Sequence, residues 1–225
     1  MTLSTLSRKV VSFLWDVDGT IVDSRKFAFD TSNHVLKHFG KQTFTSEEFR
    51  ELFLSDYRMH LKRMGINSPE EVEFLVNLWN SRLARDKYKF KLFDGIHDLL
   101  TYLHRRNYKM ALVSSTSRLQ LQLYFDLFGI NKFFSVIIAR EDVDEQKPST
   151  KPFLQAAERL AVSPRDCVII DDADDGIKAA RKMGAITIGV TWGFNSYQRI
   201  HDAKPDFIAE TANDLYEIIV EKLRC

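Results

Sequence analysis

The stretch FLWDVDGTIVDS (residues 13–24) places two aspartates, Asp16 and Asp18, directly behind a short apolar run, residues 10–15. A short run of β-branched and aromatic residues that ends in a turn is typical of a buried strand in a parallel sheet. Nearby like charges and burial both disfavour ionised carboxylates. Two aspartates at the end of such a strand therefore indicate either a bound cation or merely an acidic turn.

Five further apolar runs resemble the first in length and composition. They cover residues 109–114, 134–139, 167–171, 186–190 and 206–209. Between them lie segments with apolar residues every three or four positions, which predict helices over residues 95–106, 117–128, 149–160 and 175–184. Strands that alternate with helices predict right-handed βαβ units, and so a Rossmann-like, doubly wound α/β fold with a parallel sheet.

The region between residues 24 and 92 breaks this alternation. It contains no convincing strand, but it contains helical patterns over residues 27–39, 46–54, 57–64 and 68–88. The last of these begins with a capping signature, a serine followed by proline and, three positions after the serine, glutamate. We expect an all-helical domain at residues 24–92, inserted into a core that is formed by residues 1–23 and 93–225.

The composition limits the class of protein. The chain has 225 residues, of which 44% are hydrophobic and 28% charged, and its net charge is +1. These values allow a sizeable core, but they provide no global field that would attract nucleic acid or a membrane surface. No segment has the roughly 18 apolar residues of a membrane span, and the N-terminus lacks the apolar run of a signal peptide. We expect a cytoplasmic protein, either a monomer or a homodimer, whose two cysteines form no ligand cluster.

Polar residues that follow the predicted strands should meet in space, because ligands of doubly wound folds bind at the carboxyl ends of the strands. Ser114 and Ser115 follow the second core strand, Lys147 precedes the helix after the third, and Asp171 and Asp172 follow the fourth. Together with the first pair, the edge gathers four carboxylates, which cannot all stay ionised without a cation. A set of hard oxygen ligands indicates Mg²⁺.

This set of residues suits phosphoryl transfer. A lysine can screen a carboxylate and a phosphate together, and a serine hydroxyl with neighbouring backbone N–H groups can hold phosphate oxygens. One carboxylate could attack phosphorus to give an aspartyl-phosphate, and a second could protonate the leaving oxygen and later deprotonate water. Gly19 would allow a tight turn with close backbone approach.

The sequence resembles the haloacid dehalogenase superfamily of phosphohydrolases, in its phosphoglycolate phosphatase and β-phosphoglucomutase-like branch. DVDGT (16–20) matches the first motif of that family, ALVSS (111–115) the second, KPSTKPF (147–153) the third and IIDDADDG (169–176) the fourth. The motifs occur in order along the whole chain. The helical insert between the first two is similar to the C1-type cap of the family, and residues 24–92 are called the cap below.

The resemblance implies a role for each matching residue. Asp16 would be the nucleophile and a Mg²⁺ ligand. Asp18 would be the general acid and base, and its backbone carbonyl would also bind the metal. Lys147 would stabilise charge around the nucleophile and the phosphate. The remaining members of the expected site are Gly19, Thr20, Ser114 and Ser115 at the phosphate, and Asp171 and Asp172 at the metal, the latter as the direct ligand.

Several points stay open at this level. The Thr20 hydroxyl would hold the loop or Asp18. Lys151 stands where the third motif usually has proline, and it competes with Lys147, although the six-residue spacing to Phe153 favours Lys147. Two further acids, Asp174 and Asp175, are expected to be solvated at a helix N-terminus, where the helix dipole favours them.

The cap carries 13 Lys and Arg against 9 Asp and Glu, a net charge of +4, which would suit an anionic substrate. Chance asymmetry of solvated faces explains the same numbers. Several cap residues could bind the part of the substrate beyond the phosphate, namely Arg25, Lys26, Arg58, His60, Lys62 and Arg63. The alternative is that these side chains are exposed and only make the surface soluble.

The expected activity is Mg²⁺-dependent hydrolysis of a small phosphorylated metabolite, such as phosphoglycolate or a sugar phosphate. A phosphomutase of the same family is one alternative, which is weakened because Ala28 occupies the position of the cap histidine in a mutase branch. The other alternative is a non-catalytic phosphate-binding or regulatory protein. No P-loop or dinucleotide motif occurs, and neither acidic stretch fits an EF-hand, so other phosphate and calcium sites are not expected.

Overall fold

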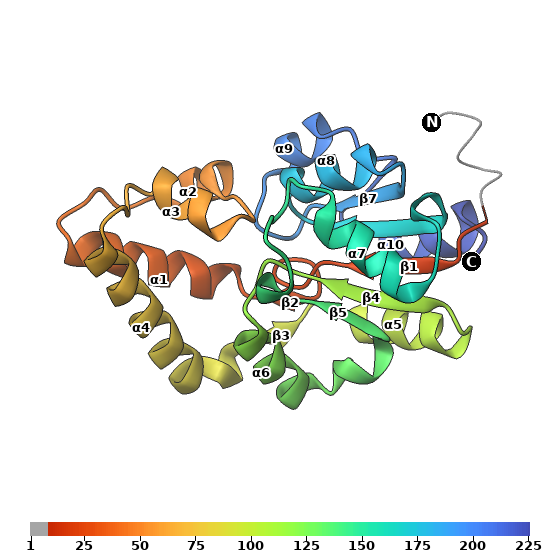
Figure 1. Cartoon of the computed structure of the whole chain (residues 1–225), viewed down its shortest axis with the longest axis horizontal. Coiled ribbons are helices and arrows are strands. Elements are labelled where there is room, and N and C mark those ends of the chain that lie inside the picture. Colours follow the sequence, from red (N-terminus) through yellow and green to blue (C-terminus); the bar gives the residue numbers. More distant parts are fainter. Residues whose placement is uncertain (1–8) are drawn as a thin grey trace.

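A six-stranded sheet forms the centre of the core in the computed structural model, which describes residues 9–225 (Figure 1). The strand order is β5–β4–β1–β6–β7–β8, and every neighbouring pair is parallel. The strands are β1 (Ser12–Trp15), β4 (Lys109–Val113), β5 (Val136–Ile138), β6 (Cys167–Asp171), β7 (Ile186–Val190) and β8 (Phe207–Ala209). Each lies within two residues of its predicted range, so the doubly wound α/β fold is confirmed.

Helices pack on both faces of this sheet, and β1 shows why. Successive side chains of a strand point to opposite faces. Phe13 and Trp15 belong to one buried cluster and Leu14 to another. The first cluster includes side chains of α5 (Ile96–Arg105), α6 (Arg118–Phe128) and α10 (Ala212–Glu217), and the second includes those of α7 (Lys151–Leu160) and α8 (Asp174–Lys182).

Four of the core helices, α5 to α8, lie where the sequence predicts them. The sequence patterns did not predict α9 (Tyr197–Asp202) or α10, both of which are only six residues long. Single helical turns complete the chain at Lys87–Lys89, Ile130–Phe133, Arg140–Asp142, Pro164–Asp166 and Ile218–Lys222.

The cap lies to one side of the sheet and consists of four helices (Figure 1). Its longest helix begins as predicted: the Ser68 hydroxyl accepts a hydrogen bond from the Glu71 N–H, and the Glu71 carboxylate accepts one from the Ser68 N–H. The four helices are α1 (Arg25–His38), α2 (Ser46–Leu52), α3 (Tyr57–Arg63) and α4 (Pro69–Asp86). Three of these helices, α1, α3 and α4, build an apolar cluster around Leu36, Leu61 and Leu75, whereas Phe49 of α2 packs in a separate cluster with Phe194.

A second, two-stranded sheet joins the cap to the core. β2 (Val22–Asp23) pairs antiparallel with β3 (Lys91–Leu92) where the chain leaves the core and returns to it. The sequence did not predict this pair, because two residues are too few to show a strand period. The pair sits at the expected domain boundaries, and the division itself stays a prediction. Within residues 9–225, no helix has both the length and the apolar character needed to cross a bilayer.

Candidate active site

Three aspartates from two adjacent strands converge at the carboxyl edge of the sheet. Asp16 follows β1, while Asp171 ends β6 and Asp172 follows it. Carboxylate oxygens of the three residues lie within 4.8 Å of one another, and all three side chains are buried. They meet because β1 and β6 are hydrogen-bonded neighbours, so residues that follow their last pairs share one edge.

Lys147 lies among these acids. Its Nζ donates hydrogen bonds to Asp16 Oδ1 at 2.6 Å and to Asp171 Oδ2 at 2.7 Å, and its side chain is only 1% exposed. Burial alone would lower the pKa of Lys147, but the charges of Asp16 and Asp171 outweigh burial and raise it. The competing Lys151 is half exposed and pairs with Asp144 and Glu145, so it lies outside this cluster.

Asp172 is held from two loops. Its Oδ1 accepts a hydrogen bond from the Thr20 hydroxyl at 2.9 Å, and its Oδ2 accepts one from the Phe194 N–H at 2.7 Å. Of the two alternatives for the Thr20 hydroxyl, holding the loop or holding Asp18, the second was wrong, because the loop after β1 folds back toward the end of β6 and the hydroxyl meets Asp172 instead. Burial and the charge of Asp171 raise the pKa of Asp172 to about 7.

Glycines make room for the acidic pair. A Cβ added to Gly19 would lie 2.2 Å from Asp172 Oδ2, and one added to Gly193 would lie 2.1 Å from the same oxygen. A Cβ added to Gly176 would lie 2.1 Å from Asp171 Oδ2. Gly19 also has a φ of +85°, which other residues rarely adopt. The close approach inferred for Gly19 from sequence therefore serves a carboxylate, and Gly176 serves the neighbouring carboxylate of Asp171 in the same way.

Asp18 turns toward helix α6 instead of joining the three acids. Its Oδ1 accepts hydrogen bonds from the Tyr124 hydroxyl at 2.7 Å and from Gln120 Nε2 at 3.3 Å, and its Oδ2 accepts one from the Thr116 hydroxyl. Burial and the nearby Asp18 charge raise the pKa of Tyr124, which keeps its hydroxyl protonated as a donor. Sequence reasoning missed these partners, although a polar pair spaced i,i+4 in an apolar helix, Gln120 and Tyr124, was a usable signal.

The two predicted serines lie on the wall of a cavity that also includes Asp16 and Asp18. The Ser114 hydroxyl accepts a hydrogen bond from the Thr116 N–H at 3.2 Å. Ser115 Oγ is buried and has no hydrogen-bond partner among residues 9–225. A buried hydroxyl without a partner is costly, so it is a suitable donor for an anionic ligand beside the acids.

The donor set fits a divalent cation. Three buried carboxylates face one ammonium group, so two negative charges have no partner if all three ionise. Burial and the neighbouring carboxylates accordingly raise the pKa of Asp16, in spite of Lys147. Hard oxygen ligands without thiol or imidazole are the set that Mg²⁺ prefers.

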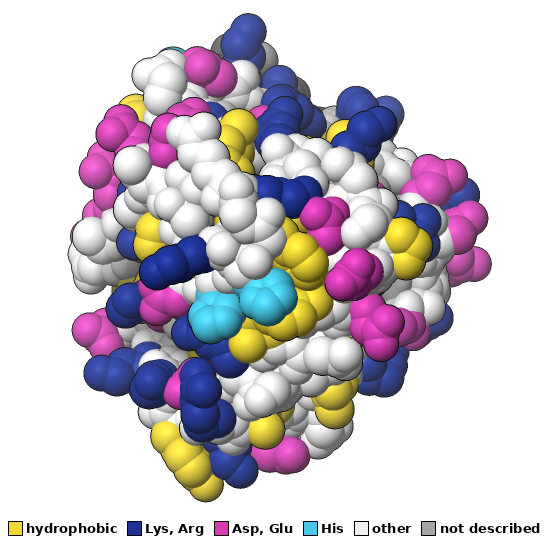
Figure 2. Space-filling model, turned by 90° about the vertical axis from the view of Figure 1, so that its left-hand side faces the viewer, with side chains coloured by type: hydrophobic (Ala, Val, Ile, Leu, Met, Phe, Trp, Pro, Cys, Tyr) yellow, Lys and Arg dark blue, Asp and Glu magenta, His cyan; other side chains and the backbone are white. Residues whose placement is uncertain are grey.

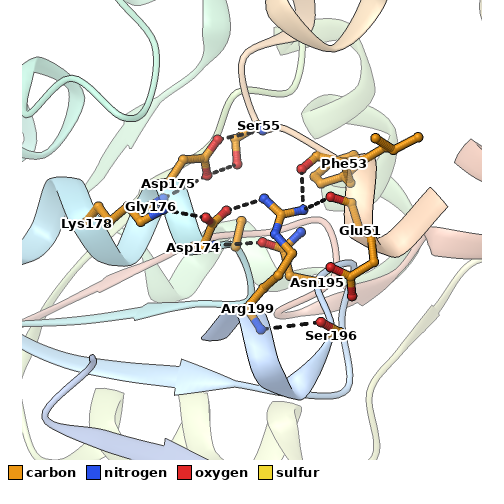
Figure 3. A network of polar contacts seen from close by, with 12 residues as sticks. Glu51, Phe53, Ser55, Asp174, Asp175, Gly176, Lys178, Asn195, Ser196 and Arg199 are labelled. Carbon is orange, nitrogen blue, oxygen red and sulfur yellow. Dashed lines mark hydrogen bonds and ion pairs between the residues drawn. The ribbon is translucent and has the colours of Figure 1, made fainter. Parts of the chain in front are cut away.

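The acids at the start of α8 are not solvated, which corrects the expectation. Asp175 is 5% exposed and accepts hydrogen bonds from the Ser55 N–H at 2.8 Å and the Ser55 hydroxyl at 2.7 Å (Figure 3). Asp174 forms ion pairs with Arg199 and Lys178, and its N–H donates to Asn195 Oδ1. Both acids therefore contact other parts of the fold, and Asp175 fastens the cap segment between α2 and α3 to the core.

The cavity is about 160 Å³ in volume and extends from the acids into the cap. Of the six residues that the sequence suggested could contact the substrate beyond its phosphate, only His60 lines the cavity. Arg25 donates to the Gly193 carbonyl, and Lys26 pairs with Asp30. Arg58, Lys62 and Arg63 are exposed. Figure 2, which faces the cap end of the molecule, shows Lys and Arg side chains spread over the surface among acidic and apolar ones.

Comparison with known protein families gives a match over most of the chain. The profile of the family described as haloacid dehalogenase-like hydrolase matches residues 13–190. Phosphoglycolate phosphatase of Synechococcus elongatus is 28% identical over 213 residues, which cover 95% of this chain and 99% of the relative. Pyrophosphatase PpaX of Anoxybacillus flavithermus is 23% identical, with 92% of this chain and 96% of the relative covered.

Solved structures share the fold. A predicted phosphoglycolate phosphatase from Haemophilus somnus superposes with a TM-score of 0.83 at 20% identity, covering 93% of this chain and 98% of the other. A predicted phosphatase from Clostridium acetobutylicum gives a TM-score of 0.82 at 21% identity, covering 95% and 100%.

Proposed function

Because the chain belongs to the family of haloacid dehalogenase-like hydrolases and is a phosphatase within it, we propose that it hydrolyses a small phosphate monoester through a covalent phosphate on Asp16. The observation that carries the proposal is the position of Lys147, which is hydrogen-bonded to Asp16 and Asp171 beside Asp172. The names of the relatives, phosphatases of phosphoglycolate and pyrophosphate, support a small phosphorylated substrate.

In the first half-reaction, a carboxylate oxygen of Asp16 attacks phosphorus while the bond from phosphorus to the leaving oxygen breaks. Asp18 gives its proton to that oxygen, so the product leaves as a neutral alcohol. In the second, Asp18 takes a proton from water as the water oxygen attacks phosphorus. The bond between Asp16 and phosphorus breaks, inorganic phosphate leaves, and both carboxyl groups return to their starting states.

Other side chains of the site bind and orient the phosphate. The Ser114 and Ser115 hydroxyls would donate to phosphate oxygens, and Lys147 would offset the negative charge shared by the phosphate and Asp16. Asp16, Asp172 and the backbone carbonyl of Asp18 would hold Mg²⁺, with Asp171 beside them. When bound, the ion would neutralise charge that develops on the phosphoryl oxygens.

We also propose that residues 24–92 act as a cap on a catalytic core formed by residues 1–23 and 93–225. The separate apolar cluster of the cap and the short β2–β3 connection support this division. Closure over the cavity would exclude bulk water while Asp16 is attacking.

Phosphate release from p-nitrophenyl phosphate and from a panel of metabolite phosphates tests the activity. We expect turnover with Mg²⁺, loss of turnover in EDTA, and a loss of at least 10³-fold in Asp16→Asn, since no nucleophile remains. Asp144→Asn, which changes an exposed aspartate outside the site, is the matched control.

Turnover that survives in Asp16→Asn would remove the nucleophile assignment. Absence of turnover with every divalent metal would favour a phosphate-binding protein. Isomerisation of a hexose phosphate that depends on a bisphosphate would favour a mutase, a reading that Ala28 on the cavity wall does not support.

A further inference from the structure

The part of the cavity beyond the acids is built mainly from apolar side chains. Phe53 stacks on Phe194 with ring centroids 4.1 Å apart, and Trp79, another aromatic residue of the wall, packs edge-on against Phe27, which does not line the cavity. Other apolar members of the wall are Ala28, Phe49, Leu54, Leu61, Met64, Leu75 and Val76. A surface of this kind favours an apolar group and offers no compensation for a charged one.

The cavity wall has little positive charge outside the phosphate end. Among the described residues that line it, Arg140 is the only lysine or arginine. Its guanidinium lies over the Tyr57 ring, 5.2 Å from the ring centroid, and pairs with Glu141. The net charge of +4 on the cap therefore lies elsewhere, on its surface. A substrate with a second anionic group would meet no free cation from the cap.

Three neutral polar groups of this wall lack partners, apart from Ser115 at the phosphate end. In the described part of the chain, the Ser24 and Tyr57 hydroxyls and His60 Nδ1 are buried and make no hydrogen bond, and the last two belong to the cap segment around α3. Burial lowers the pKa of His60 to about 4, helped by the charge of Arg63, so the imidazole is uncharged at neutral pH. Burial also raises the pKa of Tyr57. Both groups can exchange hydrogen bonds with an uncharged ligand.

We propose that this site takes a phosphate monoester whose leaving group is uncharged, largely apolar and about the size of one aromatic ring, with its polar substituents facing Tyr57 and His60. The whole cavity, phosphate end included, is about 160 Å³, and a cavity of about 150 Å³ is known to hold benzene, so the leaving group can be no larger than about one aromatic ring. The inference rests on the proposed phosphatase activity. The proposed substrate differs from phosphoglycolate and pyrophosphate, the compounds in the names of two relatives, because both of those compounds have anionic leaving groups.

Benzyl phosphate and phosphoglycolate provide the test, since both are primary alkyl phosphates. The methylene group next to the ester oxygen carries an aromatic ring in benzyl phosphate and a carboxylate in phosphoglycolate. We expect kcat/KM for benzyl phosphate to exceed that for phosphoglycolate and for pyrophosphate at least tenfold. An equal or higher value for either anionic substrate would overturn the proposal.

A positive charge introduced into the wall should weaken the preference for benzyl phosphate. Val76 is 41% exposed and lines the cavity, so Val76→Lys can be accommodated and would add an ammonium there. We expect the ratio of the two kcat/KM values to shift at least tenfold toward phosphoglycolate. Met59→Lys is the matched control, because Met59 is a 51% exposed apolar cap residue that does not line the cavity. An equal shift in both variants would contradict the assignment of the wall.

A binding measurement separates this inference from the proposed activity. Benzylphosphonate and phosphonoacetate, titrated into Asp16→Asn by calorimetry, need no turnover. Tighter binding of benzylphosphonate supports the apolar pocket, even if no ester is hydrolysed and the phosphatase proposal fails. Equal or tighter binding of phosphonoacetate overturns the pocket, even if p-nitrophenyl phosphate is hydrolysed.

Discussion

At the scale of single residues, Asp18 shows how hydrogen bonds from a neighbouring helix orient a carboxylate. The Tyr124 hydroxyl is fully buried and donates to it, and Gln120 donates to the same oxygen. Gln120 also accepts a hydrogen bond from the indole of Trp79 at 2.8 Å. The side chain of Gln120 therefore connects Trp79 of the cap to Asp18. In the proposed mechanism, Tyr124 and Gln120 would be positioning residues for the proton transfers of Asp18.

Removing the Tyr124 hydroxyl should slow the proton transfers more than it weakens binding. One lost hydrogen bond to a charged group amounts to about 1.5 kcal/mol, or roughly tenfold in rate. We expect kcat of Tyr124→Phe to fall about tenfold with little change in KM, as measured by steady-state kinetics. Tyr88→Phe, at a 78% exposed position, is the control. An unchanged kcat in Tyr124→Phe, or an equal fall in the control, would count against the positioning role.

His60 makes the stability of the protein depend on pH. Because burial depresses its folded-state pKa from 6.5 to about 4, its contribution is fully present above pH 6.5 and is lost as the pH falls through about 4. The loss should be about 3 kcal/mol. Urea unfolding at pH 7 and pH 4 should show a smaller decrease in the free energy of unfolding for His60→Gln than for the natural chain. His97→Gln, at an exposed histidine, should keep the full decrease, and identical decreases in all three proteins would refute the explanation.

At the scale of elements, one arginine of α9 completes the end of cap helix α2. The last carbonyls of a helix have no partner within it. Arg199 donates to the carbonyls of Arg50, Glu51 and Phe53 at 3.0, 2.9 and 2.8 Å, and it also pairs with Asp174 (Figure 3). The cap and the core thus share one polar junction, next to the contact between Ser55 and Asp175.

Replacing Arg199 should loosen α2 selectively. Arg199→Met leaves three carbonyls without this donor and leaves Asp174 with Lys178 as its remaining ion-pair partner, which should cost about 2–4 kcal/mol. Relative to the natural chain, we expect amide hydrogen exchange in the variant to accelerate more in Ser46–Leu52 than in the strands of the core sheet. We also expect a lower free energy of unfolding. Arg105→Met removes an exposed arginine of α5 and should change neither quantity. Unchanged exchange in α2 would show that the junction does not hold the helix.

At the scale of the whole molecule, the acidic cluster links strands that are far apart in sequence, and a cation that binds it should stabilise the fold. A ligand that binds only the folded state at 100 times its Kd adds about 2.7 kcal/mol, which raises Tm by roughly 5–10 °C for a chain of this size. Thermal unfolding with and without Mg²⁺ should show this shift in the natural chain and in Asp144→Asn. Asp172→Asn should lose most of it, and a full shift in that variant would place the ion elsewhere.

The sequence by itself determined the six core strands and helices α1 to α8, because each is encoded by a local apolar period and local caps such as Ser68 with Glu71, whereas the six-residue helices α9 and α10 are too short to show such a period. It also indicated that residues after the strands would gather, since parallel strands end at a common edge. Asp16, Lys147 and Asp171 could be grouped on that ground without any knowledge of side-chain packing.

Only the tertiary structure decided what surrounds these residues. Asp175 lies 120 positions from Ser55, and no local rule relates them, so a helix N-terminus read in isolation predicted a solvated acid. The same holds for Thr20, which bonds Asp172, and for Tyr124 beside Asp18. Short-range periodicity fixes elements, whereas hydrogen bonds between elements depend on how the cap, loops and helices pack, and on the cost of leaving buried polar groups without partners.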